Sequence, residues 1–276
     1  MGLGYSLDST KGMIMAFDES LNGQRLAYTE EGGNDALGPT GFFWLGGYRS
    51  DMRGAKAQAL VDMASASRRQ MLRFDYSGHG DSGGLFVDGT ISGWLEQSVH
   101  MFLTRARGKR IVVGSSMGGW LALLLARRLQ NEDLAAFKRI AGMVLIAPAT
   151  DMTQDLMWDK FSDREKYQLR EHGVYMRPSE YGEPYAITAK LLADGHQHMI
   201  LEAGMSLPFP VRILQGSEDV DVPPAHAVKT FEALRGADVT LTFIKGGDHR
   251  LSAAKQLELI KETVMQLALR ADGIMV

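Results

Sequence analysis

Hydrophobic positions along the middle of the chain follow two alternating patterns. Short apolar runs closed by glycine or polar residues are typical of buried strands in a parallel sheet. Longer stretches between them carry apolar residues at helical spacing. The runs occupy residues 41–47, 71–76, 111–114 and 143–147, and the helical stretches occupy residues 55–67, 90–105 and 117–129. This alternation predicts βαβ units and a parallel sheet covered by helices on both faces.

The N-terminal part predicts a different kind of element. Residues 13–19 and 25–30 are apolar enough to form two strands, and Asn22-Gly23 lies between them. Asn-Gly is a strong signal for the tight turn of a β-hairpin, because both residues adopt positive φ more easily than others. We therefore expect an antiparallel hairpin ahead of the parallel sheet.

The alternation stops after Ala149 and returns only in the last third of the chain. The segment in between is rich in Met, Trp, Tyr and charged residues, and Pro178 and Pro184 interrupt any long element. Strand and helix patterns then resume at residues 211–214, 224–234 and 239–244, followed by a closing helix with Leu257, Ile260, Val264 and Leu267 on one face. We interpret residues 1–149 and 206–276 as one α/β core, and residues 150–205 as an inserted cap or lid.

Composition narrows the class of protein further. The chain of 276 residues is 45% hydrophobic and 23% charged, which is ordinary for a globular protein, and it contains no cysteine. Without cysteine there is no disulfide framework, zinc ribbon or thiol nucleophile, and a reducing compartment is expected. The net charge of −3, without any basic block, argues against a nucleic-acid partner.

Signals for a membrane or for export are also lacking in the pattern. The longest unbroken apolar run, residues 120–126, is far shorter than the ~20 residues that a membrane span needs. Residues 1–11 are polar and glycine-containing rather than a basic start with an apolar core, so no signal peptide is expected. A cytoplasmic location is the resulting prediction.

The sequence Gly114-Ser115-Ser116-Met117-Gly118 matches the pattern G-x-S-x-G. It directly follows an apolar strand and directly precedes an apolar helix, which is the setting of a nucleophile elbow. Such a sharp turn brings backbone segments together at both glycines, where a side chain would not fit. Ser116 is therefore the candidate nucleophile, and Ser115 is expected to be structural. The alternatives are a glycine-rich turn without chemistry and a phosphate-binding loop, although both common phosphate-loop patterns are absent.

A serine nucleophile needs a base, and the base needs an acid that orients it. Where a nucleophile elbow is used, the order along the chain is serine, acid, histidine. Residues 215–223 lie between a predicted strand and a predicted helix, at the same edge of the sheet as the serine. Asp219, three residues after Gly216, is the preferred acid. The alternatives are Glu218, Asp221 and, more distantly, Asp151.

His249 is the preferred base, because it follows a strand, precedes the final helix and lies on a loop that can reach the nucleophile. His79, between Gly78 and Gly80, is interpreted as a loop residue near the pocket. His196 and His198 form an H-x-H pair in the cap, but no third ligand stands in register with them, so no metal site is predicted.

Attack on a carbonyl group builds negative charge on its oxygen, and two N–H donors are needed to stabilise that charge. The amide of Met117, directly after the nucleophile, is the first predicted donor of this oxyanion hole. The amide of Tyr48, in the loop after the strand at residues 42–45, is the second. The side chains of Ser50 and Asp51 are expected to cap the helix that follows.

Taken together, these segments resemble the α/β-hydrolase superfamily over nearly the whole chain. Residues 45–52, 73–78, 114–120 and 146–151 and the triplet Asp248-His249-Arg250 resemble the branch that contains a mitochondrial palmitoyl-protein thioesterase with acyl-glucuronide esterase activity. The resemblance implies an α/β-hydrolase fold: a mostly parallel central sheet, helices on both faces and an inserted cap. It also implies hydrolysis of carboxylic esters or thioesters by Ser116, Asp219 and His249, a mechanism that requires no metal or organic cofactor.

The chain departs from that branch at two points. Gly46-Gly47 stands where His-Gly often precedes the oxyanion residue, and Gln215 stands where His is commoner before the acid. Neither departure is expected to touch the triad. The mitochondrial location of the branch is not expected to carry over, because the sequence shows no arginine-rich transit pattern.

Methionine and aromatic side chains in the cap are candidates for the substrate site. The preferred residues are Met152, Met157, Trp158 and Tyr181, since adaptable methionines and flat aromatic surfaces suit lipophilic acyl or aryl groups. The wider set of candidates also includes Phe161, Tyr167, Tyr175, Met176 and Tyr185. The alternative is that these side chains simply pack the cap onto the core.

The leading hypothesis is a serine hydrolase that forms an acyl-enzyme with small-molecule acyl esters or thioesters. A peptidase or amidase could use the same three residues, because they act on the carbonyl group whatever the leaving group is. A ligand-binding protein without catalysis is a third class, but such proteins typically lack one member of the triad, and all three candidates are present here.

Overall fold

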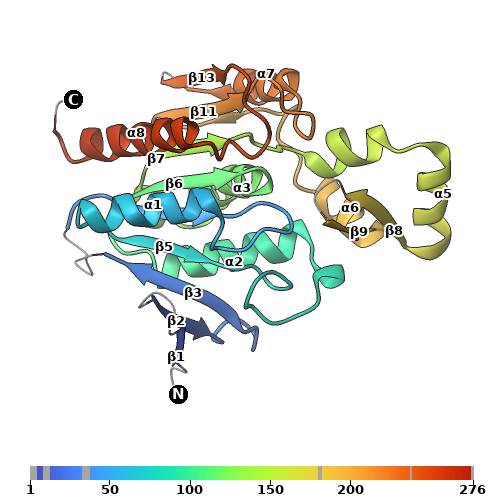
Figure 1. Cartoon of the computed structure of the whole chain (residues 1–276), viewed down its shortest axis with the longest axis horizontal. Helices are drawn as coiled ribbons and strands as arrows, with labels where there is room; N and C mark the ends of the chain where they lie inside the picture. Colours follow the sequence, from blue (N-terminus) through green and yellow to red (C-terminus); the bar gives the residue numbers. More distant parts are fainter. Residues whose placement is uncertain (1–4, 9–12, 33–37, 180–181, 237, 275–276) are drawn as a thin grey trace.

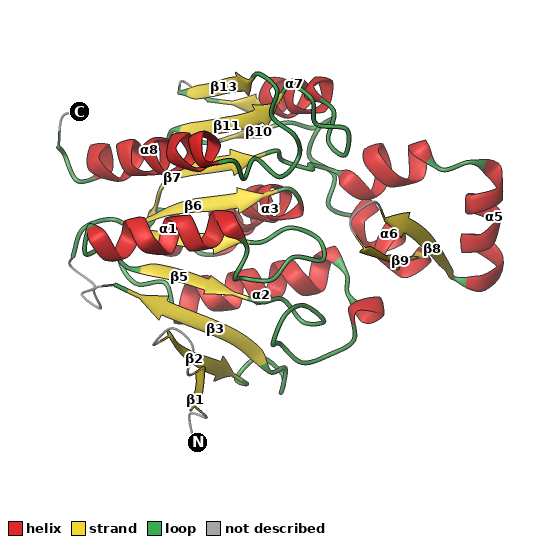
Figure 2. Ribbon diagram, viewed as in Figure 1, coloured by secondary structure: helices red, strands yellow, loops and turns green. Residues whose placement is uncertain are grey.

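A nine-stranded sheet forms the centre of the molecule in the computed structural model (Figures 1 and 2), which describes residues 5–8, 13–32, 38–179, 182–236 and 238–274. The strand order is β1-β2-β3-β5-β4-β6-β7-β11-β13. The strands are Tyr5–Asp8 (β1), Met13–Asp18 (β2), Leu26–Glu31 (β3), Gly41–Leu45 (β4), Met71–Phe74 (β5), Arg110–Ser115 (β6), Ile140–Ile146 (β7), Val211–Gly216 (β11) and Val239–Ile244 (β13).

The direction of the strands divides the sheet into two parts. The pairs from β5 through β13 are all parallel, whereas β1, β2 and β3 pair antiparallel, and β3 joins the rest by an antiparallel pairing with β5. Because parallel strands end at the same edge, the loops after β4, β6, β11 and β13 all begin there. This is the edge at which the sequence places its candidate residues.

Helices cover both faces of the sheet, and the alternation of side chains along each strand explains why. In β4, Phe42 and Trp44 join a cluster with the helices Ala55–Ala66 (α1) and Ala254–Ala271 (α8). Phe43 and Leu45 point to the other face, where the helices are Ile91–Thr104 (α2), Met117–Glu132 (α3) and Pro224–Ala233 (α7). A strand buried on both faces reads as a continuous apolar run, as the sequence shows.

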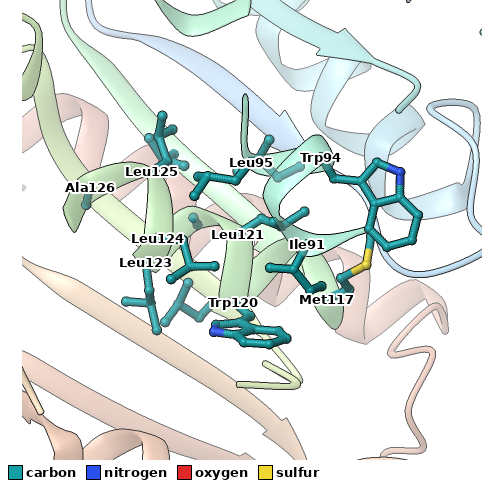
Figure 3. Close-up of a cluster of buried hydrophobic side chains, with 14 of the residues drawn as sticks. Ile91, Trp94, Leu95, Met117, Trp120, Leu121, Leu123, Leu124, Leu125 and Ala126 are labelled. Atoms are coloured by element: carbon teal, nitrogen blue, oxygen red, sulfur yellow. The ribbon is translucent and has the colours of Figure 1, made fainter. Parts of the chain in front are cut away.

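The packing of α2 against α3 fixes the start of α3. Figure 3 shows Ile91, Trp94 and Leu95 of α2 beside the apolar side chains of α3, with the sulfur of Met117 near the Trp94 ring. Trp94 and Met117 are both buried, and sulfur–aromatic contacts of this kind are favourable. The residue that follows Ser116 is thereby anchored in the core.

The cap segment lies beyond the carboxyl edge of the sheet and is drawn to the right of the core in Figure 1. It contains a π-helical turn, Thr153–Met157 (η2), a 3₁₀ turn, Trp158–Lys160 (η3), and the helices Asp163–His172 (α5) and Ala189–His196 (α6). Between the helices lies an antiparallel hairpin of Val174–Ser179 (β8) and Gly182–Thr188 (β9). The chain then returns to the core through Met205–Ser206 (β10), which pairs with Leu234–Arg235 (β12).

Most of the elements expected from the sequence are present with small changes in their bounds. The hairpin turn carries positive φ at Asn22 and Gly23, as an Asn-Gly turn requires. Strand β7 begins three residues earlier than expected, whereas β13 has the predicted bounds. The sequence did not indicate β1 or a short helix, Leu134–Phe137 (α4). In the described ranges, no helix combines the length and apolar character needed to cross a bilayer.

Candidate active site

Ser116 occupies a sharp turn between β6 and α3. Strand β6 ends at Ser115 and α3 begins at Met117, so a single residue makes the reversal. Its φ is 55° and its ψ is −121°, a conformation that residues with a side chain rarely adopt. Strained backbone of this kind is concentrated at functional sites, and here the turn has the geometry of a nucleophile elbow with Ser116 at its tip.

The two glycines of the motif are required by close backbone contacts. A Cβ atom at Gly118 would lie 2.0 Å from the carbonyl oxygen of Leu45, and one at Gly114 would lie 2.2 Å from the carbonyl oxygen of Gly118. Both distances are far below van der Waals contact, so the turn can approach β4 only without these side chains. The sequence argument for the glycines therefore has a direct structural counterpart.

Ser116, His249 and Asp219 are joined in one chain of hydrogen bonds. His249 Nε2 lies 3.0 Å from Ser116 Oγ, and His249 Nδ1 lies 2.8 Å from Asp219 Oδ2. Since a carboxylate only accepts, Nδ1 carries the proton and Nε2 is free to accept the proton of the serine hydroxyl. The arrangement can therefore remove a proton from Ser116.

The carboxylate of Asp219 is buried, and both of its oxygens accept hydrogen bonds. Its Oδ1 accepts hydrogen bonds from the amides of Asp221 at 3.0 Å and Val222 at 2.8 Å. With an exposed fraction of 3%, Asp219 is shielded from water. Donors on both oxygens hold the carboxylate in place.

The alternative acids lie elsewhere. Glu218 and Asp221 are exposed on the same turn, and Asp221 contributes its backbone amide to Asp219. Asp151 is buried at the base of the cap, where it accepts hydrogen bonds from the amides of Ile200 and Leu201. Asp151 thus ties together the two chain segments that lead into and out of the cap.

One group in the described part of the chain has the spacing of metal ligands. Atoms of Asp219, Asp221 and His249 lie within 4.8 Å of one another. However, the Asp219 carboxylate already accepts the Nδ1 proton of His249, and a metal ion at this point would replace that hydrogen bond. The geometry therefore fits an acid–base pair better than a metal site.

The loop after β4 lies directly against the nucleophile. A Cβ atom at Gly47 would be 3.3 Å from Ser116 Cβ. The amide of Met117 is the first of α3, so it has no acceptor within its own helix and lies at the positive end of the helix dipole. The Tyr48 amide follows Gly47 in this loop. Both predicted oxyanion donors are thus next to Ser116 in the chain or in space, and their role in catalysis stays a prediction.

The side chain of Tyr48 connects this loop to the cap. Its hydroxyl donates a hydrogen bond of 3.1 Å to the carbonyl of Ala186 in β9. Its ring also packs against those of Phe86, Trp94 and Tyr185. The loop that carries the predicted oxyanion donor is therefore in direct contact with β9 of the cap.

His79 has a structural role that the sequence did not reveal. It is buried, its Nδ1–H donates to the carbonyl of Ser77 at 3.2 Å, and its Nε2 accepts the amide proton of Arg49 at 3.1 Å. Burial lowers the pKa of His79, which favours the neutral ring that this pair of bonds requires. Arg49 has a positive φ of 60°, so the imidazole holds a strained residue directly after Tyr48. The motif Gly-His-Gly was the only signal in the sequence.

The expected capping of α1 by Ser50 and Asp51 is wrong. The N-cap residue of α1 is Gly54, without a side-chain hydrogen bond, because the helix begins only at Ala55. Asp51 instead accepts the amide of Arg53 at 2.7 Å and so caps a turn that precedes the helix.

The cap residues proposed for substrate binding differ in their surroundings. Met152 and Met157 are buried in the main hydrophobic cluster, as the packing alternative predicts. Trp158 is half-buried, with the cations of Lys166 and Arg170 within 5.3 and 5.7 Å of its ring centre. Tyr181 lies outside the described residues. A role in substrate binding stays a prediction for these four positions.

Among the described residues, His196 and His198 belong to no group with the spacing of metal ligands. His198 lies 2.7 Å from the hydroxyl of Ser92, and Asp194 accepts the Ser92 amide at 2.7 Å. These contacts fasten α6 to the start of α2. His198 therefore contributes to the contact between the cap and the core.

The expectation that the departure at Gln215 does not touch the triad is also wrong. Its side-chain Nε2 donates a hydrogen bond of 3.0 Å to Asp219 Oδ2, the oxygen that accepts the proton of His249. Gln215 is the second-last residue of β11, and its side chain points into the turn that carries the acid. The sequence placed it before the acid but could not show which way it points.

A family comparison agrees with this geometry. The model of the alpha/beta hydrolase family matches residues 37–258, most of the chain. The chain belongs to the alpha/beta hydrolase family. Curated relatives of this hydrolase include the palmitoyl-protein thioesterase ABHD10, mitochondrial, of Bos taurus, which is 29% identical over 231 residues, 82% of this chain and 72% of the relative. The Homo sapiens protein of that name is 28% identical over 229 residues, with the same shares of the two chains.

Solved structures extend the similarity of this hydrolase to nearly its whole length. A crystal structure of a protein from Agrobacterium vitis S4 has a TM-score of 0.87 and 38% identity, covering 97% of this chain and 100% of that one. The alpha/beta hydrolase domain-containing protein 10 from mouse has a TM-score of 0.77 and 25% identity, covering 97% and 98%. The expected α/β-hydrolase fold and the resemblance to the thioesterase branch are thereby confirmed.

Proposed function

We propose that this alpha/beta hydrolase is a serine hydrolase that cleaves carboxylic esters or thioesters. The proposal is carried by one observation, the chain of hydrogen bonds from Asp219 through His249 to Ser116 at a strained strand-to-helix turn. A serine hydroxyl is a poor nucleophile until a base removes its proton, and this chain supplies an oriented base.

The reaction follows from the positions of the protons. His249 Nε2 takes the proton of Ser116 as Oγ attacks the carbonyl carbon, and Asp219 stabilises the imidazolium that forms. The amides of Met117 and Tyr48 stabilise the oxyanion. The imidazolium then gives its proton to the leaving alkoxide or thiolate, which departs and leaves an acyl group on Ser116. Water, deprotonated by His249, attacks this ester, and the imidazolium returns the proton to Ser116 Oγ as the acid leaves.

The substrate class is supported by the relatives and by the cap. Curated relatives at 28–29% identity are named palmitoyl-protein thioesterases, which favours a thioester among the possible substrates. An acyl chain is apolar, and the cap offers an aromatic side chain, Trp158, that is not fully buried in the core. We propose a lipophilic acyl group as the part that the cap recognises. The cytoplasmic location stays a prediction.

A panel of substrates with one acyl group tests the proposed reaction. Hydrolysis of an octanoyl nitrophenyl ester, thioester and anilide should proceed for the first two and be slow for the third. Ser116→Ala should lower turnover by roughly 10⁴ to 10⁶, whereas Ser115→Ala, its neighbour in β6, should keep most of it. A preference for the anilide would favour a peptidase or amidase, and hydrolysis that survives Ser116→Ala would refute the serine mechanism.

The length of the acyl chain tests the role of the cap. If Trp158 contacts the acyl group, Trp158→Ala should raise KM for octanoyl esters more than for acetyl esters. Tyr167→Ala, at an exposed position on α5, is the matched control and should change neither. Equal effects of Trp158→Ala on both chain lengths would argue for packing alone.

A further inference from the structure

We propose that Gln215 is a positioning residue of the triad, which holds Asp219 and limits the basicity that Asp219 confers on His249. The inference rests on the proposed function and deepens it. It is carried by the contacts of one buried side chain that the reaction itself does not use.

The orientation of the Gln215 amide is fixed by its neighbours. Gln215 is fully buried, and its nitrogen Nε2 lies 3.0 Å from Asp219 Oδ2, 2.9 Å from the carbonyl oxygen of Val222 and 3.3 Å from that of Gly216. All three neighbours are acceptors, so only the NH₂ group can face them. Within the described residues, the amide oxygen has no hydrogen-bond partner. All the hydrogen bonds of this side chain are thus made by its NH₂ group.

Two N–H groups on one nitrogen allow Gln215 to close the turn that carries the acid. One bond reaches the carboxylate of Asp219 and another reaches the carbonyl of Val222. Asp219 in turn accepts the amide of Val222 with its other oxygen. The side chains of Gln215 and Asp219 therefore bridge the turn, and the carboxylate is held by Gln215 while it accepts from His249.

Gln215 also has an electrostatic effect, because it shares an oxygen of Asp219 with His249. Asp219 Oδ2 accepts from both Gln215 and His249. A donor on a carboxylate stabilises its charge and thereby weakens its attraction for a second cation. Removing the amide should therefore strengthen the pull of Asp219 on the imidazolium and raise the pKa of His249. A primary amide does not titrate in the working range of pH, so this contribution is constant.

Other charged groups around the acid and the base remain unchanged in such a test. Lys56 on α1 donates to the carbonyl of Arg250 next to His249, and burial lowers the pKa of Lys56 to about 8. Asp248 and Arg250 flank His249, and exposed Asp221 lies beside Asp219. Glu218 is the remaining acid of the turn and is exposed. Since all of them are present in both proteins, a difference between wild type and a Gln215 variant reports on Gln215.

The test is the Gln215→Met variant, which keeps the length of the side chain but has no donor. The pKa of His249 is measured by NMR titration of its ring protons, and the acidic limb of kcat/KM is measured with an octanoyl nitrophenyl ester. Both should move to higher pH by about one unit, the size expected for losing a hydrogen bond to a charged group. On the acidic limb of the wild-type profile, kcat/KM should fall about tenfold, with little change in KM.

Gln97→Met is the matched control. Gln97 is a buried glutamine of α2 whose amide bonds Gln24 and Ser77, away from the triad. It should lower thermal stability without moving the pKa of His249. An unmoved or lowered pKa of His249 in Gln215→Met, or an equal shift in Gln97→Met, would overturn the inference.

A second variant keeps the inference testable if Gln215→Met does not fold. In Gln215→His, an imidazole replaces the amide beside Asp219 and becomes charged at low pH. The new cation should lower the pKa of His249, and the two titrations should be coupled. Independent titrations, with His249 as in wild type, would contradict the contact. These NMR measurements do not depend on turnover, so an inactive wild type would refute the proposed function without deciding this inference.

Discussion

Ser116 holds a conformation that costs about 1–3 kcal/mol of strain, and specific hydrogen bonds keep it there. Its amide donates to the carbonyl of Ile146 at 2.9 Å. Its carbonyl accepts the amides of Gly119 at 2.9 Å and Ala149 at 3.1 Å. The turn is therefore held by backbone hydrogen bonds to β7, to Ala149 after it and to α3.

The choice of Asp219 as the acid is tested by replacing its charge. Asp219→Asn removes the acceptor that holds the Nδ1 proton of His249, so kcat should fall by about 10⁴-fold. Asp221→Asn, two residues away and exposed, should stay within a few-fold of wild type. Steady-state kinetics on one ester substrate measures both. A larger loss for Asp221→Asn than for Asp219→Asn would show that the acid was assigned to the wrong residue.

The contact of His79 with the oxyanion loop leads to a second prediction. His79→Phe keeps a ring against Tyr76, Phe86 and Trp94 but leaves the amide of Arg49 without its acceptor. A buried unpaired donor costs about 1–3 kcal/mol. We expect kcat to fall about tenfold or more, with KM nearly constant, because the loop supports the transition state. Unchanged kcat in a folded His79→Phe protein would show that the imidazole does not position the loop.

The residues that the sequence indicated and those that it missed differ in a physical way. Ser116, Asp219 and His249 each stand in a local motif after a strand, so the pattern could select them, and the structure joins them by hydrogen bonds. Gln215 and His79 act through contacts whose direction depends on the folded backbone. The bond between His79 and Arg49 links residues 30 positions apart, and no local pattern encodes it.

At the scale of elements, the elbow depends on how closely three backbone segments approach. Strand β4, strand β6 and helix α3 meet at Gly114 and Gly118, where the distances leave no space for a Cβ atom. Over its first ten residues, helix α3 is buried on all sides between the sheet and α2 (Figure 3). The start of α3 can therefore not shift away to relieve a clash.

This close approach predicts the effect of one methyl group. Gly118→Ala would place Cβ 2.0 Å from the carbonyl oxygen of Leu45, so the backbone must move and the free energy of unfolding should fall by about 1–3 kcal/mol. Gly54→Ala, where the nearest atom is 3.8 Å away, is the control. Chemical denaturation measures both. Equal stability of the two variants would contradict the close packing of the elbow.

The cap shows where prediction of elements from sequence stops. Strands β11 and β13 are recognisable because they are apolar runs in a parallel sheet. The strands β8 and β9 contain Pro178 and Pro184 and pair only with each other, so they lack the pattern of a buried strand. The turns η2 and η3 span five and three residues, which is too short for a hydrophobic period to be recognised in the sequence.

At the scale of the whole molecule, an ion cluster fastens the N-terminal hairpin to the parallel core. Asp18 of β2 accepts hydrogen bonds from Ser20, from Arg105 at the end of α2 and from His100. Burial raises the pKa of the Asp18 carboxyl, but these donors outweigh burial and hold the pKa well below its ordinary range. The folded state thus stabilises the charged form of Asp18.

The lowered pKa of Asp18 predicts how stability depends on pH. A carboxyl with a depressed pKa stabilises the fold above its unfolded value of 3.8 and loses this contribution as pH falls through its folded value. Asp18→Asn should therefore be less stable than wild type at pH 7, and the difference should shrink below about pH 4. Urea denaturation at pH 7, 5 and 3 measures it, with Asp88→Asn at an exposed position as control. A difference that grows toward low pH would contradict the assignment.

The arrangement of the whole sheet explains why the candidate residues meet. The loops after β6, β11 and β13 carry Ser116, Asp219 and His249, and parallel pairing brings these loops to one edge beneath the cap (Figure 1). Residues more than a hundred positions apart thereby come within hydrogen-bonding distance. The order of parallel strands is therefore what turns three separate motifs into one site.

Covalent labelling tests most directly whether that site activates its serine. The folded protein is treated with a fluorophosphonate, and the modified peptide is located by mass spectrometry, with Ser116→Ala and Ser115→Ala treated alongside. We predict one adduct, on Ser116, formed by wild type and Ser115→Ala and lost in Ser116→Ala. An unlabelled wild type, or an adduct that persists in Ser116→Ala, would contradict the assignment of Ser116 as the nucleophile.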